Sequence, residues 1–192
     1  MKMNEETISD SNVILHKLLQ SAHIQSKLEE KWKSADTNMT MDKFAENGSW
    51  VFEFVDKELA SILYPNICRT LGDSYKAFEY VHDNPNFSPF QRYTIQGIGS
   101  VAMYFAASKI KQKRNITDER KALLDALDVF ERDALSSPTQ FVSGKSVPNL
   151  EDIVVFGVLR SVQGLPAHED LVLKHSEKLN NWYKRMQQEV PY

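Results

Sequence analysis

The sequence is poor in the residues that build covalent or metal-bound sites. Only one cysteine, Cys68, occurs among 192 residues. A disulfide within the chain and a zinc site of paired cysteines are therefore excluded, and a lone thiol suits a reducing compartment. The five histidines show no His-x-x-x-His or His-Glu-x-x-His spacing, so no metal site is expected. No nucleophile and base stand out as a pair, and no catalytic residue is assigned.

A strong excess of charge and a long apolar run are also missing. The formal net charge is −3 and the basic residues do not gather into a broad patch, which argues against a nucleic-acid partner. The longest apolar run, residues 153–159, is far shorter than the ~20 residues of a membrane span. The first residues resemble neither a signal peptide nor a transit peptide. We therefore expect an intracellular protein, cytoplasmic or mitochondrial, with no targeting segment in this sequence.

Apolar residues recur at helical spacing along most of the chain, whereas the alternation that a strand needs is missing. The sequence therefore predicts an all-α fold. A first helix carries residues 13–19 and begins at Asp10 or Ser11. Residues 23–48 are mostly polar and are interpreted as a connector that includes a helical turn. Further helices are expected over 49–64, 73–82, 89–113, from 117 onward, and in a final region that carries Leu171, Leu179, Trp182, Tyr183 and Met186.

One segment predicts a helix at the centre of the fold. Asn149 is a good N-cap, and Asp152 stands three residues on, where its carboxylate can reach back to the N–H of the cap. Residues 150–160 are apolar on nearly every side, unlike a surface helix. Gly157 in the middle of this segment predicts close approach by another helix. A capping box that opens a buried central helix resembles the folding signature of the C-terminal domain of glutathione transferases.

The predicted helix over 89–113 carries aromatic residues and a basic end. The aromatics alternate with small residues and are interpreted as core, or else as the wall of a lipophilic pocket lined by Tyr93 and Tyr104. The basic end suits the negative pole of the helix dipole, and forms either a solvated terminus or a contact for an anion or acidic partner. The aromatics are Phe90, Tyr93, Tyr104 and Phe105, and the basic residues are Lys109, Lys111, Lys113 and Arg114.

Several stretches together resemble the prostaglandin E synthase 2 family. They are residues 65–70 (Pro-Asn-Ile-Cys-Arg-Thr), 102–105, 148–164 and 181–185, while 8–14 is similar to the end of the family's thioredoxin-like domain. The resemblance implies a thioredoxin-like domain with a Cys-x-x-C motif, followed by an all-helical domain. It also implies isomerisation of prostaglandin H2 to prostaglandin E2, binding of glutathione and haem, and association with membranes or mitochondria. The Cys-x-x-C motif is absent from this sequence.

By this resemblance, Asp10 and Ser11 match the family's contacts to glutathione. A carboxylate suits the ammonium of the γ-glutamyl end, and a hydroxyl at a helix N-terminus suits its carboxylate. Without a ligand the same two residues are a helix cap. Haem would need one of the histidines or Cys68 as its ligand, and Cys68 is either a buried bystander or a reactive thiol.

Four positions of the family's cavity wall differ in this sequence. Ser61 and Tyr64 stand where the family has a histidine and a serine, and Lys109 and Lys113 replace two arginines. A lysine cannot fork onto a carboxylate as an arginine does. These differences argue against a retained family activity.

The sequence thus predicts an all-α bundle of the glutathione transferase C-terminal type. Residues 1–22 would be the remnant final helix of a thioredoxin-like domain, 23–48 a connector and 49–192 the helical domain. The implied function is that of a prostaglandin E synthase 2-like protein that is inactive without the Cys-x-x-C domain. The alternative is a non-catalytic scaffold or accessory subunit of a larger assembly. An apolar face left uncovered predicts a homodimer or a protein partner, and the resemblance adds peripheral membrane association.

Overall fold

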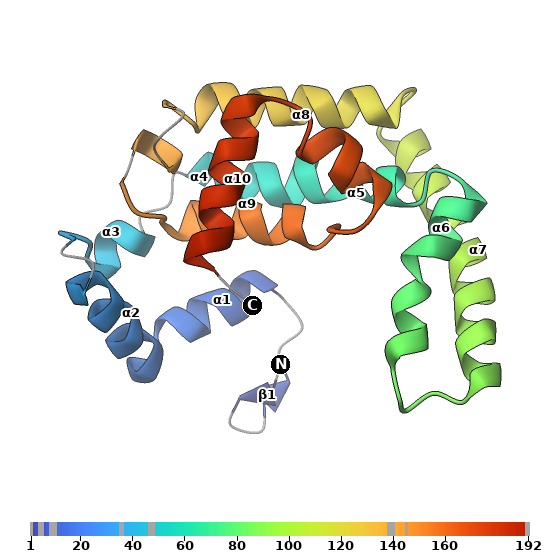
Figure 1. The fold of residues 1–192 in the computed structure, drawn as a ribbon, viewed down its shortest axis with the longest axis horizontal. Coiled ribbons are helices and arrows are strands. Elements are labelled where there is room, and N and C mark those ends of the chain that lie inside the picture. The colour runs from blue at the N-terminus through green and yellow to red at the C-terminus, as the bar shows by residue number, and fades with distance from the viewer. Residues whose placement is uncertain are drawn as a thin grey trace. The chain divides into compact units, whose positions relative to one another are not determined.

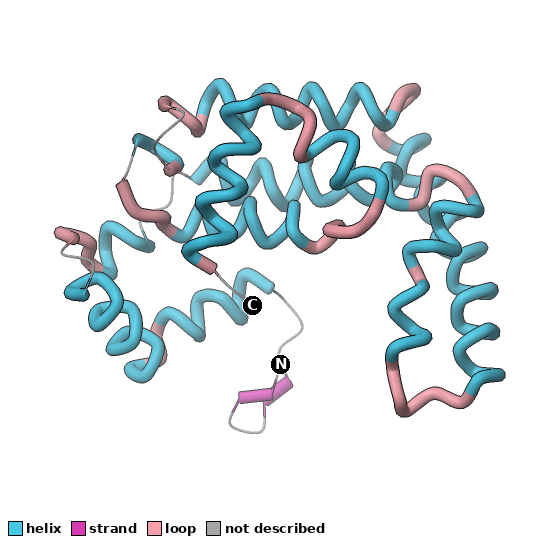
Figure 2. The backbone as a smooth tube through the Cα atoms, in the orientation of Figure 1, coloured by secondary structure: helices cyan, strands magenta, loops and turns pink. Residues whose placement is uncertain are grey.

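The computed structural model describes residues 2–3, 6–7, 11–34, 37–45, 49–137, 141–144 and 146–190, of which 2, 3, 6, 7, 11, 12, 49, 143 and 171 are described by their backbone alone. The chain divides into two compact units, Met1–Glu46 and Asn47–Tyr192, called unit 1 and unit 2 below. The prediction of an all-α fold is confirmed. Figure 2 shows helices throughout both units, and the described strands are two pieces of two residues each.

Unit 1 contains a short strand pair and three helices. β1 (Lys2–Met3) and β2 (Glu6–Thr7) pair antiparallel, with Lys2 opposite Thr7. Two residues in each strand are too few to show an alternating pattern, so the sequence does not predict this pair. The helices are α1 (Ser11–Leu19), α2 (Ala22–Ser34) and α3 (Met41–Ala45).

The helix α2 corrects the interpretation of residues 23–48 as a connector with a single helical turn. It is 13 residues long, and Ile24, Leu28 and Trp32 recur at every fourth position, which gives a mostly polar segment one apolar stripe. Trp32 is buried, and its ring centroid lies 5.4 Å from that of Phe44 in α3. Most of the α2 surface is exposed to solvent, so its residues are mostly polar. The polar average of the segment therefore does not indicate a helix, although the apolar spacing does.

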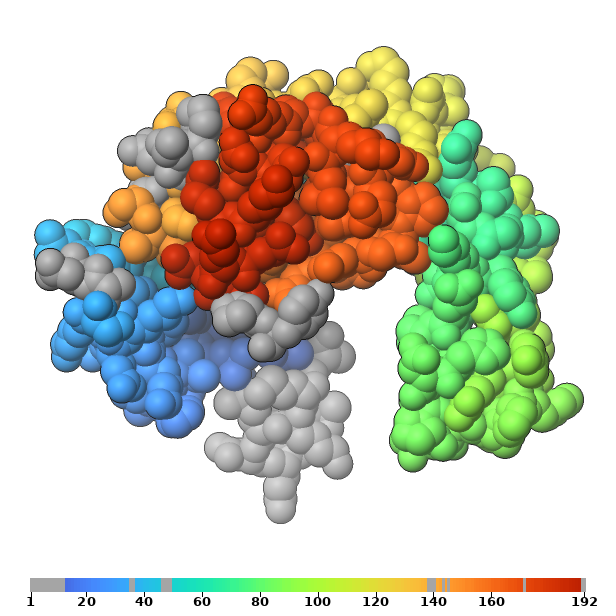
Figure 3. All heavy atoms as spheres, in the orientation of Figure 1, coloured from blue at the N-terminus to red at the C-terminus, as the bar shows by residue number. Residues whose placement is uncertain are grey.

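Unit 2 is a helical bundle with a hairpin that projects from it, as Figures 1 and 3 show. α4 (Ser49–Phe54), the π-turn η1 (Val55–Leu59) and α5 (Ala60–Ile67) form one nearly continuous helical segment. The hairpin consists of α6 (Leu71–Ala77), the 3-10 turn η2 (Glu79–Asp83) and the long α7 (Pro89–Lys113). The remaining elements are α8 (Glu119–Asp133), the 3-10 turn η3 (Val142–Gly144), α9 (Leu150–Arg160), the π-turn η4 (His168–Val172) and α10 (Glu177–Glu189).

The core of unit 2 lies where α8, α9 and α10 meet the segment from α4 to α5. Leu123, Leu127 and Phe130 of α8 are fully buried, as their spacing predicts. The ring centroid of Phe130 lies 5.2 Å from that of Trp182 in α10, in an edge-to-face arrangement. Such aromatic pairs contribute about 0.5–1.5 kcal/mol beyond the burial of their area, so this contact holds α10 against α8.

The predicted capping box at the start of α9 is confirmed. The N–H of Asp152 donates to Oδ1 of Asn149 at 3.1 Å, and the N–H of Asn149 donates to Oδ2 of Asp152 at 3.0 Å. The second carboxylate oxygen of Asp152 accepts hydrogen bonds from the N–H of Val142 at 3.0 Å and from Nε1 of Trp182 at 2.8 Å. The box therefore joins α9 to η3 and α10 in addition to capping it.

The prediction that another helix approaches α9 closely at Gly157 is wrong. Gly157 is exposed, and a Cβ atom built on it would meet no described atom within 4 Å outside its own helix. Ile153, Val154 and Val158 on the same side are only partly buried. The central helix thus buries one side against the core and leaves another side open.

The two arms of the hairpin pack closely at Gly99. A Cβ atom at this position would lie 2.8 Å from the ring of Phe78, closer than real Cβ contacts come. The start of α7 is fixed by a second capping box, in which Ser88 accepts from the N–H of Gln91 and the Gln91 side chain accepts from the N–H of Ser88. The absence of a side chain at Gly99 therefore lets the two arms of the hairpin come together.

Candidate functional site

The long helix α7 presents an apolar face to solvent. Five side chains form this face, called the α7 face below: Phe90, Tyr93, Ile98, Val101 and Phe105, which are 80%, 64%, 68%, 46% and 59% exposed. The interpretation of the α7 aromatics as core is therefore wrong for the three that belong to this face. Helix α7 packs against α6, η2 and α5 through its other side. An exposed apolar area of this kind on a folded protein marks an interaction site.

The buried side of α7 is polar instead. Gln96 is 2% exposed and donates from Nε2 to the carbonyl of Tyr75 at 3.0 Å, while its Oε1 lies 2.6 Å from Nε2 of His82. Ser100, one turn further along, is also buried and donates to the carbonyl of Gln96. The spacing Arg92, Gln96, Ser100 was the sequence signal for this arrangement, because it places polar groups on one line of the helix.

A shallow, open hollow lies in the α7 face. Its lining is mostly apolar and consists of Tyr93, Thr94, Gly97, Ile98, Val101 and Ala102. A Cβ atom at Gly97 would meet no described atom within 4 Å, so the helix backbone itself is accessible at the bottom of the hollow. Tyr93 belongs to the lining as the pocket interpretation predicts, whereas Tyr104 does not. The hollow suits an apolar side chain from another molecule.

The positions of the resembled cavity wall lie on α5 and α7. The hydroxyl of Ser61 donates to the carbonyls of Lys57 at 3.0 Å and Glu58 at 2.7 Å, so it is bonded within its own helical segment. Tyr64 points across to α7, where its hydroxyl contacts the sulfur of Met103. Burial raises the pKa of Tyr64, with a smaller contribution from Cys68, so its hydroxyl stays protonated. None of these contacts activates a nucleophile.

The basic end of α7 is partly paired within the chain. Lys111 donates from Nζ to Oε2 of Glu119 at 2.5 Å, and Nε of Arg69 lies 3.1 Å from Oε1 of the same carboxylate. Burial raises the pKa of Glu119. The hydrogen bond from Lys111 and the charges of Lys111 and Arg69 lower the same pKa by more, so its net shift is downward. Lys109 and Lys113 are exposed. No local sequence pattern indicates the pair of Arg69 and Glu119, because the two residues lie on different elements.

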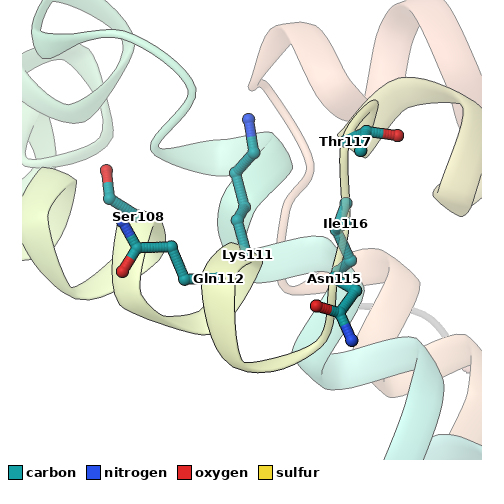
Figure 4. Close-up of a pocket in the computed structure, with 6 residues that line it drawn as sticks. All are labelled: Ser108, Lys111, Gln112, Asn115, Ile116 and Thr117. Atoms are coloured by element: carbon teal, nitrogen blue, oxygen red, sulfur yellow. The ribbon is translucent and has the colours of Figure 1, made fainter.

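An open polar pocket adjoins this cluster. Figure 4 shows Ser108 and Lys111 pointing to the same side of α7, with the turn that follows the helix closing the other side. The lining is completed by Gln112, Asn115, Ile116 and Thr117. The ammonium of Lys111 is already bonded to Glu119. It would therefore bind an anion in this pocket more weakly than an unpaired lysine would.

Cys68 is buried at the end of α5. It is 1% exposed, and burial raises its pKa, while a hydrogen bond with Ser74 partly opposes this shift. A thiol needs a lowered pKa and access to solvent to act as a nucleophile. The structure therefore favours the interpretation of Cys68 as a bystander.

The family resemblance implies glutathione and haem as ligands. Asp10 and the side chain of Ser11 lie outside the described residues, so their contact to glutathione stays a prediction. Three of the side chains that could ligate haem iron are enclosed or already bonded, which does not suit that role. Cys68 is buried, His82 is bonded to Gln96, and the two ring nitrogens of His168 are enclosed beside Tyr183.

Among the described residues, no group of three or more His, Cys, Asp or Glu side chains is placed to hold a metal ion. Within the same part of the chain, every helix is too short or too polar to cross a membrane.

Comparison with known proteins places the chain near one family. No family model matches it. A relative from Danio rerio named prostaglandin E synthase 2 is 33% identical over 135 residues, which are 70% of this chain and 35% of the relative. A relative from Mus musculus with the same name is 30% identical over 139 residues, 72% of this chain and 35% of the relative. The chain spans about a third of the length of these relatives. It is distantly related to the proteins named prostaglandin E synthase 2.

Proposed function

We propose that this chain belongs to the prostaglandin E synthase 2 family and supplies the helical half of a two-part isomerase site, without isomerase activity of its own. The state of Cys68 carries the proposal. It is the only thiol in the chain, and it is buried with a raised pKa. The family reaction is the glutathione-linked isomerisation of prostaglandin H2 to prostaglandin E2. If a thiol pair carries it out, another polypeptide segment must provide those thiols.

The two sides of α7 support different parts of this proposal. Met103 lies on the part of α7 that faces α5, where it contacts the hydroxyl of Tyr64. The exposed Lys109 and Lys113 follow on the same helix. By the family resemblance, Tyr64, Lys109 and Lys113 occupy positions of the cavity wall, so they would border the substrate once a thiol-bearing domain is in place. In this arrangement the lysines attract the carboxylate of a fatty-acid-derived substrate as point charges.

An activity assay tests the first part of the proposal. The purified chain is incubated with prostaglandin H2 and glutathione, and prostaglandin E2 is measured against a heat-denatured sample and a protein-free sample. We expect no product above these controls. Turnover above both controls would show that the chain has an active site of its own and would refute the proposal.

Complementation tests the second part. A separately purified thioredoxin-like domain with a Cys-x-x-C motif is added, and we expect product formation to exceed that of either protein alone. A double-serine variant of the motif is the control for the added domain. Lys113→Ala should lower the restored rate, whereas Lys121→Ala, on the exposed side of α8, should not. Equal rates with the intact and the double-serine domain would refute the two-part site.

A second candidate function is that of a non-catalytic scaffold or accessory subunit. The exposed α7 face favours it, because an uncovered apolar surface is more useful to a binding protein than to a catalyst. A failure of complementation, with the chain still folded, would make this candidate the better one. In either case we propose an intracellular location, cytoplasmic or mitochondrial, which fractionation of cells expressing the tagged protein would distinguish.

A further inference from the structure

We propose that a hollow beside Trp50 binds the guanidinium group of an arginine side chain, presented by a partner polypeptide or by a small molecule. The hollow has a volume of about 260 Å³. This is less than the roughly 300–1,000 Å³ of pockets for larger ligands, so it suits a single side chain. The inference does not depend on the proposed enzymatic role. The residues that line the hollow are Trp50, Glu53, Phe54, Lys57, Glu58 and Val129.

Two aromatic rings form the wall of the hollow. The ring centroids of Trp50 and Phe54 lie 5.8 Å apart, with the rings inclined at 57°. Phe54 is buried and stacks on Phe130 of α8, with ring centroids 6.4 Å apart, so the core holds this ring in place. Trp50 is 36% exposed and forms the accessible part of the wall. A guanidinium plane stacks on such rings, and tryptophan attracts a cation more strongly than the other aromatic residues do.

The charged side chains around the rings leave one carboxylate for a ligand. Lys57 donates from Nζ to Oε1 of Glu53, one turn earlier, so these two charges neutralise each other. The carboxylate of Glu58 is exposed, and among the described residues no partner bonds to it. The hollow therefore has a net negative charge beside its aromatic wall. A guanidinium group matches both features, because its N–H fork donates to a carboxylate while its plane covers a ring.

The backbone explains why these groups lie together. Trp50, Phe54 and Glu58 recur at every fourth position, so they lie along one side of the segment from α4 to η1. At the end of η1 the N–H of Ala60 donates to the carbonyl of Val55, which makes a wider turn than that of an α-helix. Such π-turns are rare and occur frequently at functional sites. Glu58 lies within this turn and Phe54 directly precedes it.

Tryptophan fluorescence tests the hollow with N-acetyl-arginine amide as the probe. Of the three tryptophans, Trp32 and Trp182 are buried, so a ligand in the hollow should change mainly the emission of Trp50. We expect a saturable change with a millimolar dissociation constant. N-acetyl-citrulline amide is the matched control, because it has nearly the same shape without the charge, and it should bind at least about fivefold more weakly.

A short fluorescein-labelled peptide with one central arginine distinguishes the two sources of the guanidinium group. Fluorescence anisotropy follows its binding, and the same peptide with citrulline is the control. Tighter binding of the arginine peptide than of N-acetyl-arginine amide would identify a polypeptide as the source. Equal or weaker binding of the peptide would identify a small molecule. The guanidinium site itself is supported in both cases.

Variants assign the binding to the hollow. Glu58→Gln removes the charge and Trp50→Leu removes the ring, and each should weaken binding about two- to fivefold, as expected for exposed ion pairs and cation–π contacts. The anisotropy assay serves Trp50→Leu as well, because its signal comes from the peptide. Glu79→Gln and Tyr80→Leu are the matched controls, since they change the same kinds of exposed side chain on η2 of the hairpin and should leave binding unchanged.

Circular dichroism shows that each variant is folded, and Glu58→Gln keeps the test decisive if Trp50→Leu is unstable. Absence of saturable binding by both the small probe and the peptide would overturn the proposal. So would equal binding of the arginine and citrulline probes. Binding that the hollow variants leave unchanged, or that the hairpin variants weaken equally, would also overturn it.

Discussion

Replacing Asp152 by alanine is the sharpest test of how unit 2 is held together. The carboxylate is fully buried and accepts three hydrogen bonds, from the N–H groups of Asn149 and Val142 and from Nε1 of Trp182. Asp152→Ala removes the acceptor and leaves three donors enclosed without partners. The three donors belong to the start of α9, to η3 and to α10, so the substitution affects three elements at once.

The expected loss follows from two opposing effects. Each buried donor that loses its partner costs about 1–3 kcal/mol. Burial raises the pKa of Asp152, while the bonds from Trp182, Asn149 and Val142 lower it, and the net upward shift means that enclosing the charge is itself unfavourable. Removal of the carboxylate relieves that penalty. We expect a net loss of about 3–5 kcal/mol, as found when one member of a buried charged group is removed. This is a large part of a typical domain's stability of 5–15 kcal/mol.

Urea unfolding followed by circular dichroism, with a thermal scan, measures this loss. At about 2–4 °C for each kcal/mol in a chain of this size, the melting temperature should fall by about 10 °C. Asn149→Ala, which removes the cap and keeps the carboxylate, should lose only about 1–2 kcal/mol. The control is Asp125→Ala, because Asp125 is exposed on α8, where it accepts hydrogen bonds from the ammonium of Lys121. An Asp152→Ala chain as stable as Asp125→Ala would refute the reasoning.

Three further predictions concern other elements of unit 2. Glu119→Gln should lower the free energy of unfolding by about 1–2 kcal/mol at neutral pH. Because the pKa of Glu119 is lowered in the folded chain, this difference from wild type should vanish as the pH falls below about 4.3 and through the folded pKa. Urea unfolding midpoints measured at several pH values would show this. Gly157→Ala should stabilise by about 1 kcal/mol, whereas Gly99→Ala, which brings a Cβ atom within 2.8 Å of Phe78, should be less stable than Gly157→Ala by about 1–2 kcal/mol in thermal scans. Burial lowers the pKa of His168, so wild-type stability should fall as pH drops from about 6.5 through the folded value, and His168→Phe should remove this slope in the same urea series.

Each of these predictions has a clear contrary outcome. A Glu119→Gln difference that persists unchanged in acid would show that the ion pairs are not what stabilises that site. Equal melting temperatures for the two glycine variants would contradict the close approach of the hairpin arms. A pH slope that survives in His168→Phe would assign the acid sensitivity to another group.

The sequence by itself determined where most helices of unit 2 begin and which of their sides are buried. The sequence predicts helices over 89–113, from 117 onward and after Asn149, and in the structure Ser88, Asp118 and Asn149 cap α7, α8 and α9. These signals are local, since a cap acts on backbone groups two or three residues away. Leu123, Leu127 and Phe130 share one side of α8 at helical spacing, so their burial follows from the same short-range periodicity.

Only the tertiary structure decided which apolar sides are covered. The aromatics of α7 show the same helical spacing as a core helix, yet Phe90 and Phe105 are exposed, because α6 and α5 lie on the polar side of Gln96 and Ser100. Gly157 sits in an apolar helix and is nevertheless open. Spacing shows that a helix has an apolar side, but the element that covers this side comes from elsewhere in the chain or from another molecule.

The hydrogen bonds of Asp152 show the same difference between local and long-range contacts. The bonds between Asn149 and Asp152 join residues three apart, and the sequence predicts them. The bond from Trp182 joins residues thirty apart, and the ion pair between Arg69 and Glu119 joins the loop after α5 to the first residue of α8. Such pairs form only after the chain has brought distant elements together, and no periodicity or cap within one element records them. The helices thus follow from local sequence, whereas burial, long-range pairing and the exposure of the α7 face depend on packing.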